Sequence, residues 1–155
     1  MSDKPALRAL AESSFSLPHL RDGQLAGMGA LVDGIDVLAV MPTGYGKSAI
    51  YQVAALHLHQ QTGRPAVVVS PLIALQEDQL DGLSQDLGTD AAVAINSSHS
   101  DADVEMSWKA AEDGKAVFVF LAPEQLAKQS TVDRIKALDI SLFVVDEAHC
   151  VSSWG

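Results

Sequence analysis

The fold of this chain is decided by residues 41–48, which read Met41-Pro42-Thr43-Gly44-Tyr45-Gly46-Lys47-Ser48. A short apolar run, Asp36–Met41, leads into them, and a stretch with helical spacing, Lys47–His59, follows. The sequence therefore predicts a strand, a glycine-containing loop and a helix, with Gly-Lys-Ser where the helix begins. This is the Walker A arrangement, in which a loop and a helix N-terminus bind phosphate groups.

The residue types in this loop suit phosphate chemistry. Gly44 and Gly46 allow backbone angles and a close approach that side chains would block. Lys47 would bridge the β- and γ-phosphates, and the Ser48 hydroxyl would ligate Mg²⁺. The generic pattern opens with glycine, where this chain has Met41, so a tight turn with an exposed lysine stays an alternative. The residues expected to bind the nucleotide here are Thr43, Gly44, Tyr45, Gly46, Lys47 and Ser48.

A second candidate segment follows the apolar run Ser141–Val145, which ends in Asp146-Glu147-Ala148-His149. A carboxylate at the end of a hydrophobic strand is the Walker B arrangement. Asp146 would hold Mg²⁺ through water, and Glu147 would orient and deprotonate an attacking water as general base. The alternative is a solvated acidic turn.

Apolar runs alternate with helical patterns along the whole chain, which favours βαβ units and a parallel sheet covered on both faces. The expected strands are Asp36–Met41, Ala66–Ser70, Ala91–Ile95, Ala116–Leu121 and Ser141–Val145. The expected helices between them are Lys47–His59, Leu72–Leu87, Asp101–Glu112 and Pro123–Leu138. The predicted fold class is α/β, a three-layer P-loop NTPase fold with a mostly parallel sheet. Its ligands should bind beyond the carboxyl ends of the strands.

Composition bounds the function. The chain has 155 residues, of which 48% are hydrophobic, enough for one domain or part of one. Ten basic against twenty acidic residues give 10 − 20 = −10, which argues against a polybasic nucleic-acid coat but not against a local cationic groove. A single cysteine, Cys150, suits a reducing compartment. With no signal-peptide pattern at Met1–Pro5 and no long apolar run, we expect a soluble cytoplasmic protein without a membrane partner, nucleoid-associated if bacterial.

The motifs together resemble the RecQ-like ATP-dependent DNA helicases of superfamily 2. In that family a methionine is usual at the position of Met41, so this departure from the generic loop disappears. The resemblance spans Phe15 to Gly155 and includes the acidic segment with the residues that follow it. The matching segments are 41–48 with Tyr51-Gln52, Val67–Leu75 with Asp78-Gln79, Asn96-Ser97-Ser98, Ala122–Leu126, and Asp146–His149 with Cys150–Gly155.

The resemblance implies a RecA-like lobe that uses ATP and Mg²⁺. It makes Lys47, Asp146 and Glu147 the expected catalytic residues, and Ser48 and Asp146 the expected Mg²⁺ ligands. His149 would couple the nucleotide state to the DNA-binding loops; the alternative is an ordinary surface histidine.

The resemblance also implies an adenine-sensing motif, in which Arg21 and Gln24 match. A glutamine amide can pair with both the N6 donor and the N7 acceptor of adenine. The alternative is that both are surface residues at the start of a helix. Leu17 stands where the family has a stacking aromatic residue, so base selectivity would be looser.

For the complete protein the resemblance implies 3′ to 5′ unwinding of single-stranded or forked DNA by two lobes. Ser70 and Ser97 could contact DNA or simply cap helices, and Gln125 stands where the family often has arginine. Residues 1–155 would then be a partial helicase ATP-binding domain, incomplete at the C-terminus, with 1–35 as the adenine-motif region.

The resemblance implies that the complete protein has a further strand in this lobe and a second lobe with an arginine finger. We therefore expect the chain alone to be of low stability and to retain at most weak nucleotide binding, with negligible hydrolysis and no unwinding. The alternatives are a non-catalytic nucleotide-binding remnant or regulatory module, and a different motor of the superfamily. The segment Cys150–Gly155 argues against that last alternative.

Overall fold

The computed structural model describes residues 4–15, 19–20, 22–34, 47–69, 81–83, 85, 87–88, 91–95 and 100–145. The chain divides into two compact units, residues 1–61 and 62–155. The expected adenine-motif region, 1–35, belongs to the first unit together with most of the helix that follows the phosphate loop.

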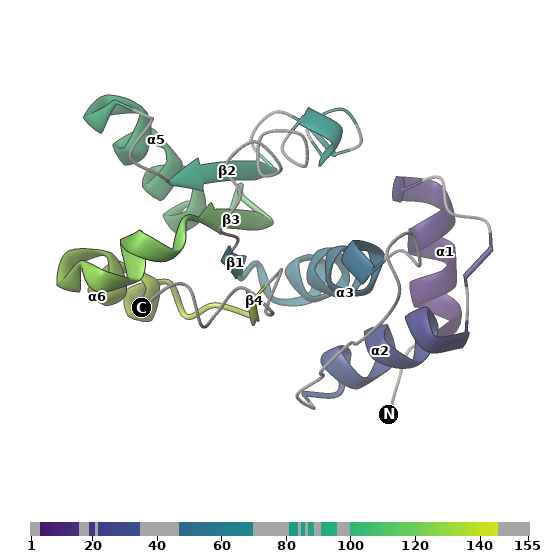
Figure 1. The fold of residues 1–155 in the computed structure, drawn as a ribbon. Helices are drawn as coiled ribbons and strands as arrows, with labels where there is room; N and C mark the ends of the chain where they lie inside the picture. Colours follow the sequence, from purple (N-terminus) through teal and green to yellow (C-terminus); the bar gives the residue numbers. More distant parts are fainter. Residues whose placement is uncertain are drawn as a thin grey trace. The chain divides into compact units, whose positions relative to one another are not determined.

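The first unit is helical. It contains α1 (Lys4–Phe15), α2 (Asp22–Val32) and all but the last residue of α3 (Lys47–Thr62). In α1 the residues Leu7, Ala11 and Phe15 recur every four positions, and all three are buried. This spacing places them on one helix face, and α1 contacts α2, in which Leu25 and Met28 are also buried (Figure 1).

The helix α3 confirms the predicted helix 47–59 and continues to Thr62. It is apolar nearly all round and correspondingly buried, as expected for an interior helix. The helix is followed by Gly63, whose φ of +75° is a conformation that glycine adopts without strain. The buried apolar residues of α3 are Ala49, Ile50, Tyr51, Val53, Ala54, Ala55 and Leu56.

The second unit contains a parallel sheet, which confirms the α/β fold class. Its four strands follow the order β2-β3-β1-β4. The bounds are β1 (Ala66–Val69), β2 (Ala92–Ile95), β3 (Phe118–Leu121) and β4 (Leu142–Val145). All three pairings are parallel. The expected strand Asp36–Met41 lies outside the described residues.

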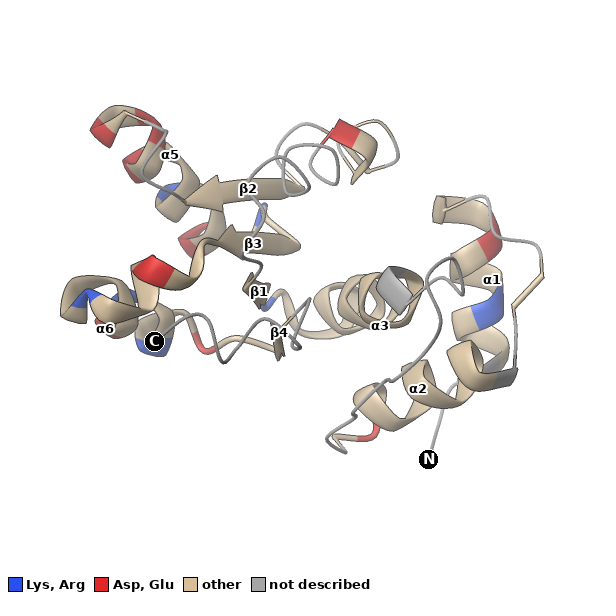
Figure 2. Cartoon of the chain, in the orientation of Figure 1, with Lys and Arg blue, Asp and Glu red and all other residues tan. Residues whose placement is uncertain are grey.

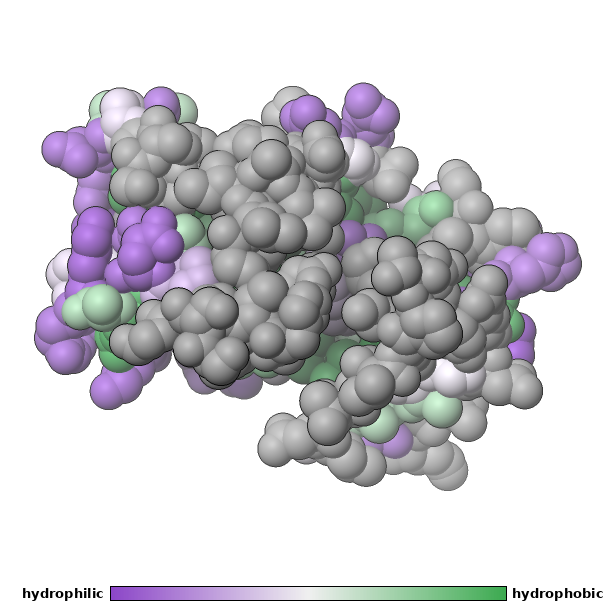
Figure 3. All heavy atoms as spheres, in the orientation of Figure 1, coloured by the Kyte–Doolittle hydropathy of each residue, from purple (hydrophilic) through white to green (hydrophobic). Residues whose placement is uncertain are grey.

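Both faces of the central strands are buried, as a sheet covered on both sides requires. The helices α5 (Asp101–Glu112) and α6 (Gln129–Leu138) lie on the same side of the sheet in Figure 1 and pack against one face of it. Their outer surfaces are mostly hydrophilic (Figure 3). The core between them contains Val67, Val69, Ile95, Trp108, Ala111, Ala116, Val119, Leu121 and Ile135.

The predicted helix Asp101–Glu112 is confirmed, whereas the single helix predicted over Pro123–Leu138 is wrong. The structure has a 3₁₀ helix, η1 (Pro123–Ala127), followed by α6. Lys128 separates them with extended backbone, at φ −90° and ψ 120°. The Lys128 amide donates to the Gln125 carbonyl at 3.1 Å, which closes the 3₁₀ turn. Of the predicted helix 72–87, residues 81–83, 85 and 87 are helical, and the others lie outside the described residues.

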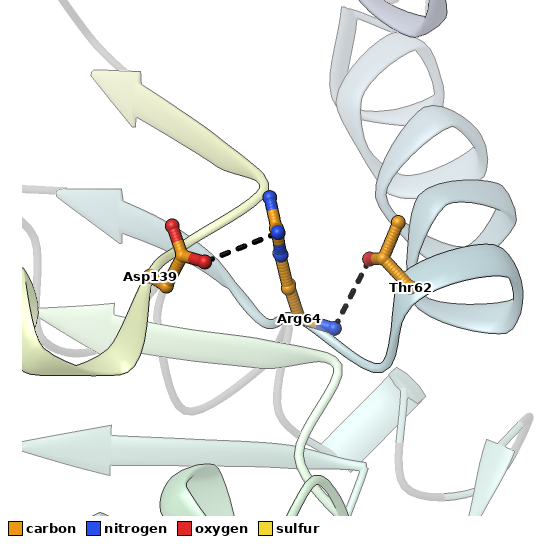
Figure 4. Close-up of polar contacts among 3 residues, drawn as sticks. All are labelled: Thr62, Arg64 and Asp139. Atoms are coloured by element: carbon orange, nitrogen blue, oxygen red, sulfur yellow. Dashed lines mark hydrogen bonds and ion pairs between the residues drawn. The ribbon is translucent and has the colours of Figure 1, made fainter.

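At the amino ends of the strands, the loops before β1 and β4 are tied together. Arg64 pairs with Asp139 at 3.1 Å, and the Arg64 amide donates to the Thr62 hydroxyl (Figure 4). The Ser141 amide and hydroxyl both donate to the Pro65 carbonyl, at 2.8 and 3.2 Å. These contacts brace the edge of the sheet opposite the one where ligands are expected.

No helix in the described ranges is long and apolar enough to cross a membrane.

Candidate nucleotide-binding site

The four strands of the second unit end at the same level. Val69 of β1 is in register with both Leu121 of β3 and Val145 of β4, and Leu121 is in register with Ile95 of β2. Because the strands are parallel, their carboxyl ends form one edge of the sheet. In the sequence, these strand ends are followed directly by Ser70, Asn96, Ala122 and Asp146. The motif-containing segments therefore follow strand ends that lie along one edge of the sheet.

In the first unit, α3 begins at Lys47 and Ser48, directly after the glycine loop. The first amides of a helix have no partner within the helix, and its dipole favours negative charge there. The first turn of α3 holds no acidic residue that would repel a phosphate. The backbone at this point therefore suits an anion, as the motif predicts, and the roles of the two side chains stay predictions.

Several expected site residues lie outside the described residues, so their roles as ligands stay predictions. They are Arg21, Thr43, Gly44, Tyr45, Gly46, Asp146, Glu147 and His149. Leu17, Ser70 and Ser97, named for base stacking and DNA contact, lie outside them too.

Gln24 is the expected adenine-sensing residue whose side chain the structure describes. It lies in the first turn of α2, is 7% exposed and takes part in an interaction within the structure. Buried amides generally have hydrogen-bond partners. Whether it reads adenine stays a prediction.

Gly27, three residues after Gln24, is a further residue that the motifs did not single out. Gly27 lies one turn further along α2, and a Cβ added there would stand 2.9 Å from Cγ2 of Ile50 in α3. Such a distance is below any ordinary van der Waals contact, so the two helices touch closely at this point. The signal in the sequence is a glycine inside an otherwise regular helical stretch, three residues after Gln24.

Gln125 lies inside the protein. Its side chain is 4% exposed, and its Oε1 accepts a hydrogen bond from the Thr131 hydroxyl at 3.4 Å. This contact joins η1 to α6 across the break at Lys128. Gln125 therefore holds the turn after β3, while Lys128 is exposed within that turn.

Charge is unevenly distributed over the helices of the second unit (Figure 2). The first turn of α5 carries Asp101 and Asp103, and the Ser100 hydroxyl caps it by accepting from the Asp103 amide at 3.2 Å. The Arg134 guanidinium of α6 pairs with Glu105 of α5 at 2.8 Å. The N-terminus of α5 is thus already capped and acidic, which disfavours an anion there.

Comparison with known proteins gives relatives that are named as ATP-dependent helicases. The chain is 33% identical to the ATP-dependent DNA helicase RecQ of Bacillus subtilis over 149 residues, which are 96% of this chain and 24% of that protein. It is 35% identical to the ATP-dependent helicase SGS1 of Saccharomyces cerevisiae, over 91% of this chain and 10% of that protein. It is 38% identical to the ATP-dependent helicase wrn-1 of Caenorhabditis elegans, over 97% of this chain and 14% of that protein.

The chain thus spans about a quarter or less of the length of each of these relatives. Residues 21–155 match the DEAD/DEAH box helicase family. This range includes both nucleotide motifs and every strand of the described sheet. The resemblance to RecQ-like helicases is confirmed, and the chain belongs to the DEAD/DEAH box helicase family.

Proposed function

We propose that this chain is the N-terminal ATP-binding part of a RecQ-like DNA helicase, which couples ATP hydrolysis to 3′–5′ unwinding of DNA in the complete protein. One observation carries most weight. The phosphate-loop motif leads directly into the first turn of α3, in a chain whose residues 21–155 match the helicase family. A non-catalytic nucleotide-binding module is less favoured, because the relatives are named as ATP-dependent helicases.

The donor set fits a magnesium nucleotide. A serine hydroxyl and a carboxylate are the oxygen ligands that Mg²⁺ prefers. Ser48 and Asp146 would hold the ion, which when bound neutralises charge on the transferring phosphate. Lys47 would neutralise the β- and γ-phosphate oxygens, and the loop amides of residues 43–48 would orient them. Glu147 would accept a proton from the attacking water.

The adenine end of the nucleotide would be read by Arg21 and Gln24. The amide of Gln24 offers one donor and one acceptor in the spacing of adenine N7 and N6. Its side chain is buried, and burial restricts the orientations open to it, which favours selective pairing with one base.

DNA would pass over the carboxyl edge of the sheet, where parallel α/β sheets bind ligands. Ser70 and Ser97 lie just past strands β1 and β2 in the sequence, and the exposed Lys128 follows β3. A lysine at this edge could neutralise a phosphate, and His149 would relay the nucleotide state to the DNA-binding loops. Such an enzyme would act on single-stranded or forked DNA in the cytoplasm, on the nucleoid in a bacterium.

The test is the ATPase activity of the full-length protein with single-stranded DNA, in the wild type and in Glu147→Gln. Removal of the general base should slow hydrolysis by about 100-fold or more while ATP binding persists. Glu112→Gln is the matched control, since Glu112 is an exposed glutamate at the end of α5, and it should hydrolyse ATP at the wild-type rate. Unwinding should need a 3′ rather than a 5′ single-stranded tail.

Two results would contradict the proposal. One is wild-type hydrolysis by Glu147→Gln, because the expected base would then have no part in the reaction. The other is an ATPase indifferent to DNA, since a helicase couples hydrolysis to its nucleic-acid track.

A further inference from the structure

Gly27 of α2 lies close to Ile50 of α3. An added Cβ would stand 2.9 Å from Cγ2 of Ile50, 3.5 Å from its Cδ1 and 3.7 Å from its Cγ1. Ile50 is buried, with 3% of its surface exposed. A glycine in the middle of a helix costs stability relative to alanine, about 1 kcal/mol. Here the absence of a side chain on Gly27 permits the close contact with Ile50.

This contact lies one turn beyond each of the two turns that would bind the ends of the nucleotide. Gln24 is three residues before Gly27, so both lie on the same face of α2. Ile50 is three residues after Lys47, one turn into α3. In Figure 1 the two helices run in the same general direction, so their N-terminal ends lie on the same side. The contact therefore lies about one turn beyond Gln24 in α2 and one turn beyond Lys47 in α3.

We propose that Gly27 is a positioning residue for base selection: its missing side chain sets the distance between Gln24 and the phosphate-binding turn of α3. The inference rests on the proposed function, in which Gln24 reads adenine and α3 holds the phosphates. Gly27 itself touches no nucleotide. It acts through the space beside α2 that its missing side chain leaves for Ile50.

A side chain at position 27 would displace α2 rather than Ile50. Isoleucine is β-branched and nearly confined to one χ1 rotamer in a helix, so its Cγ2 cannot turn away. Hydrogen bonds weaken steeply with distance and angle, so a small displacement of Gln24 impairs its pairing with adenine. The phosphates are bound by the loop and by α3, so their binding stays unchanged.

The test uses the full-length protein and its DNA-stimulated hydrolysis of ATP and of GTP. In Gly27→Ala the KM for ATP should rise about 3- to 10-fold, the value of one hydrogen bond, with kcat within about twofold. The KM for GTP should change less, because guanine carries the O6 acceptor in place of the N6 donor and shares only the N7 acceptor with adenine. Ala26→Leu, which adds volume on the exposed side of α2, should leave every parameter unchanged.

A second variant separates positioning from general damage. Ile50→Ala in the Gly27→Ala background opens room for the new methyl group and should restore the KM for ATP. If Gly27→Ala alone does not fold, Ile50→Ala in the wild-type background loosens the same contact, and the ATP-selective rise in KM is expected there.

The outcomes distinguish this inference from the function on which it rests. Equal changes in KM for ATP and GTP, a fall in kcat alone, or no rescue by Ile50→Ala would overturn the positioning role of Gly27. A wild type without ATPase activity would instead overturn the proposed nucleotide site, and a wild type without preference for ATP over GTP would overturn the adenine-reading role of Gln24.

Discussion

Asp139 ends α6 in the left-handed region, with φ 54° and ψ 62°, a conformation that costs most residues energy. Its carboxylate pairs with Arg64, but both side chains are well exposed, at 73% and 51%, so the pair itself contributes little. The backbone angle should therefore dominate the effect of a substitution. Asparagine and glycine tolerate this region, whereas alanine does not.

Substitution of Asp139 separates the two effects, because Asp139→Gly and Asp139→Ala both remove the carboxylate. Asp139→Ala should have a free energy of unfolding about 1 kcal/mol below that of Asp139→Gly. Urea denaturation of the two variants measures this difference. Equal stabilities would show that the left-handed turn carries no strain in solution.

At the scale of elements, α5 and α6 are joined through Arg134. Its guanidinium pairs with Glu105 at 2.8 and 3.1 Å and lies 5.5 Å from the centroid of the Trp108 ring. Its Nη1 is buried with no hydrogen-bond partner in the described part of the chain. The planar guanidinium thus packs against α5 in addition to forming an ion pair with it.

Arg134→Lys keeps the charge but loses the planar group over Trp108, so it should lower the free energy of unfolding by about 1 kcal/mol. Glu105→Gln should cost less than about 0.5 kcal/mol, because the Glu105 side chain is 64% exposed. Chemical denaturation in low and high salt checks both values. A larger loss in Glu105→Gln than in Arg134→Lys would mean that the ion pair, not the ring contact, joins the helices.

The hydrogen bond between Thr131 and Gln125 holds η1 against α6. Thr131→Val keeps the shape but removes the donor, and the buried Gln125 Oε1 should cost about 1–2 kcal/mol when left unpaired. Adding Gln125→Leu to Thr131→Val should lower the free energy of unfolding by less than the first substitution did, since no buried acceptor then remains unpaired. A double-mutant cycle by thermal unfolding measures this coupling. Strict additivity would contradict the role of the bond.

These elements show what local sequence can predict. The bounds of α5 were predictable because Ser100 caps it and acidic residues fill its first turn. The helix predicted over 123–138 was wrong because the backbone closes a 3₁₀ turn and is extended at Lys128, a break that Gln125 and Thr131 span with a buried hydrogen bond. Helical periodicity does not record such a contact.

At the scale of the whole molecule, alternation of apolar runs and helices predicted the parallel α/β class. The order β2-β3-β1-β4 was not predictable from that pattern, because it pairs strands far apart in the sequence. The phosphate-loop motif was readable because its residues are consecutive. The contact between Gly27 and Ile50 was not, since it joins two helices through space.

Strand β4 leaves apolar surface uncovered in the described sheet. Phe143 is 51% and Val145 38% exposed, at the open end of the strand order. Exposed apolar strands at a sheet edge promote association. The 155-residue chain should therefore self-associate with rising concentration, and Phe143→Lys should reduce this. Light scattering after gel filtration measures it.

Met106→Lys is the control for that experiment, because Met106 is 70% exposed but lies on α5, away from the sheet edge. It should leave self-association unchanged. If Met106→Lys and Phe143→Lys act alike, general surface hydrophobicity rather than the edge of β4 would be the cause.

The central claim is that residues 41–48 and the first turn of α3 bind the phosphates of ATP. The most direct measurement is a titration of the full-length protein with a fluorescent ATP analogue and Mg²⁺, in the wild type, Lys47→Ala and Lys136→Ala. Loss of a charged hydrogen-bond donor should weaken binding about tenfold or more in Lys47→Ala. Lys136→Ala, which removes an exposed lysine from the end of α6, should bind like the wild type. Equal affinity in all three proteins would contradict the account.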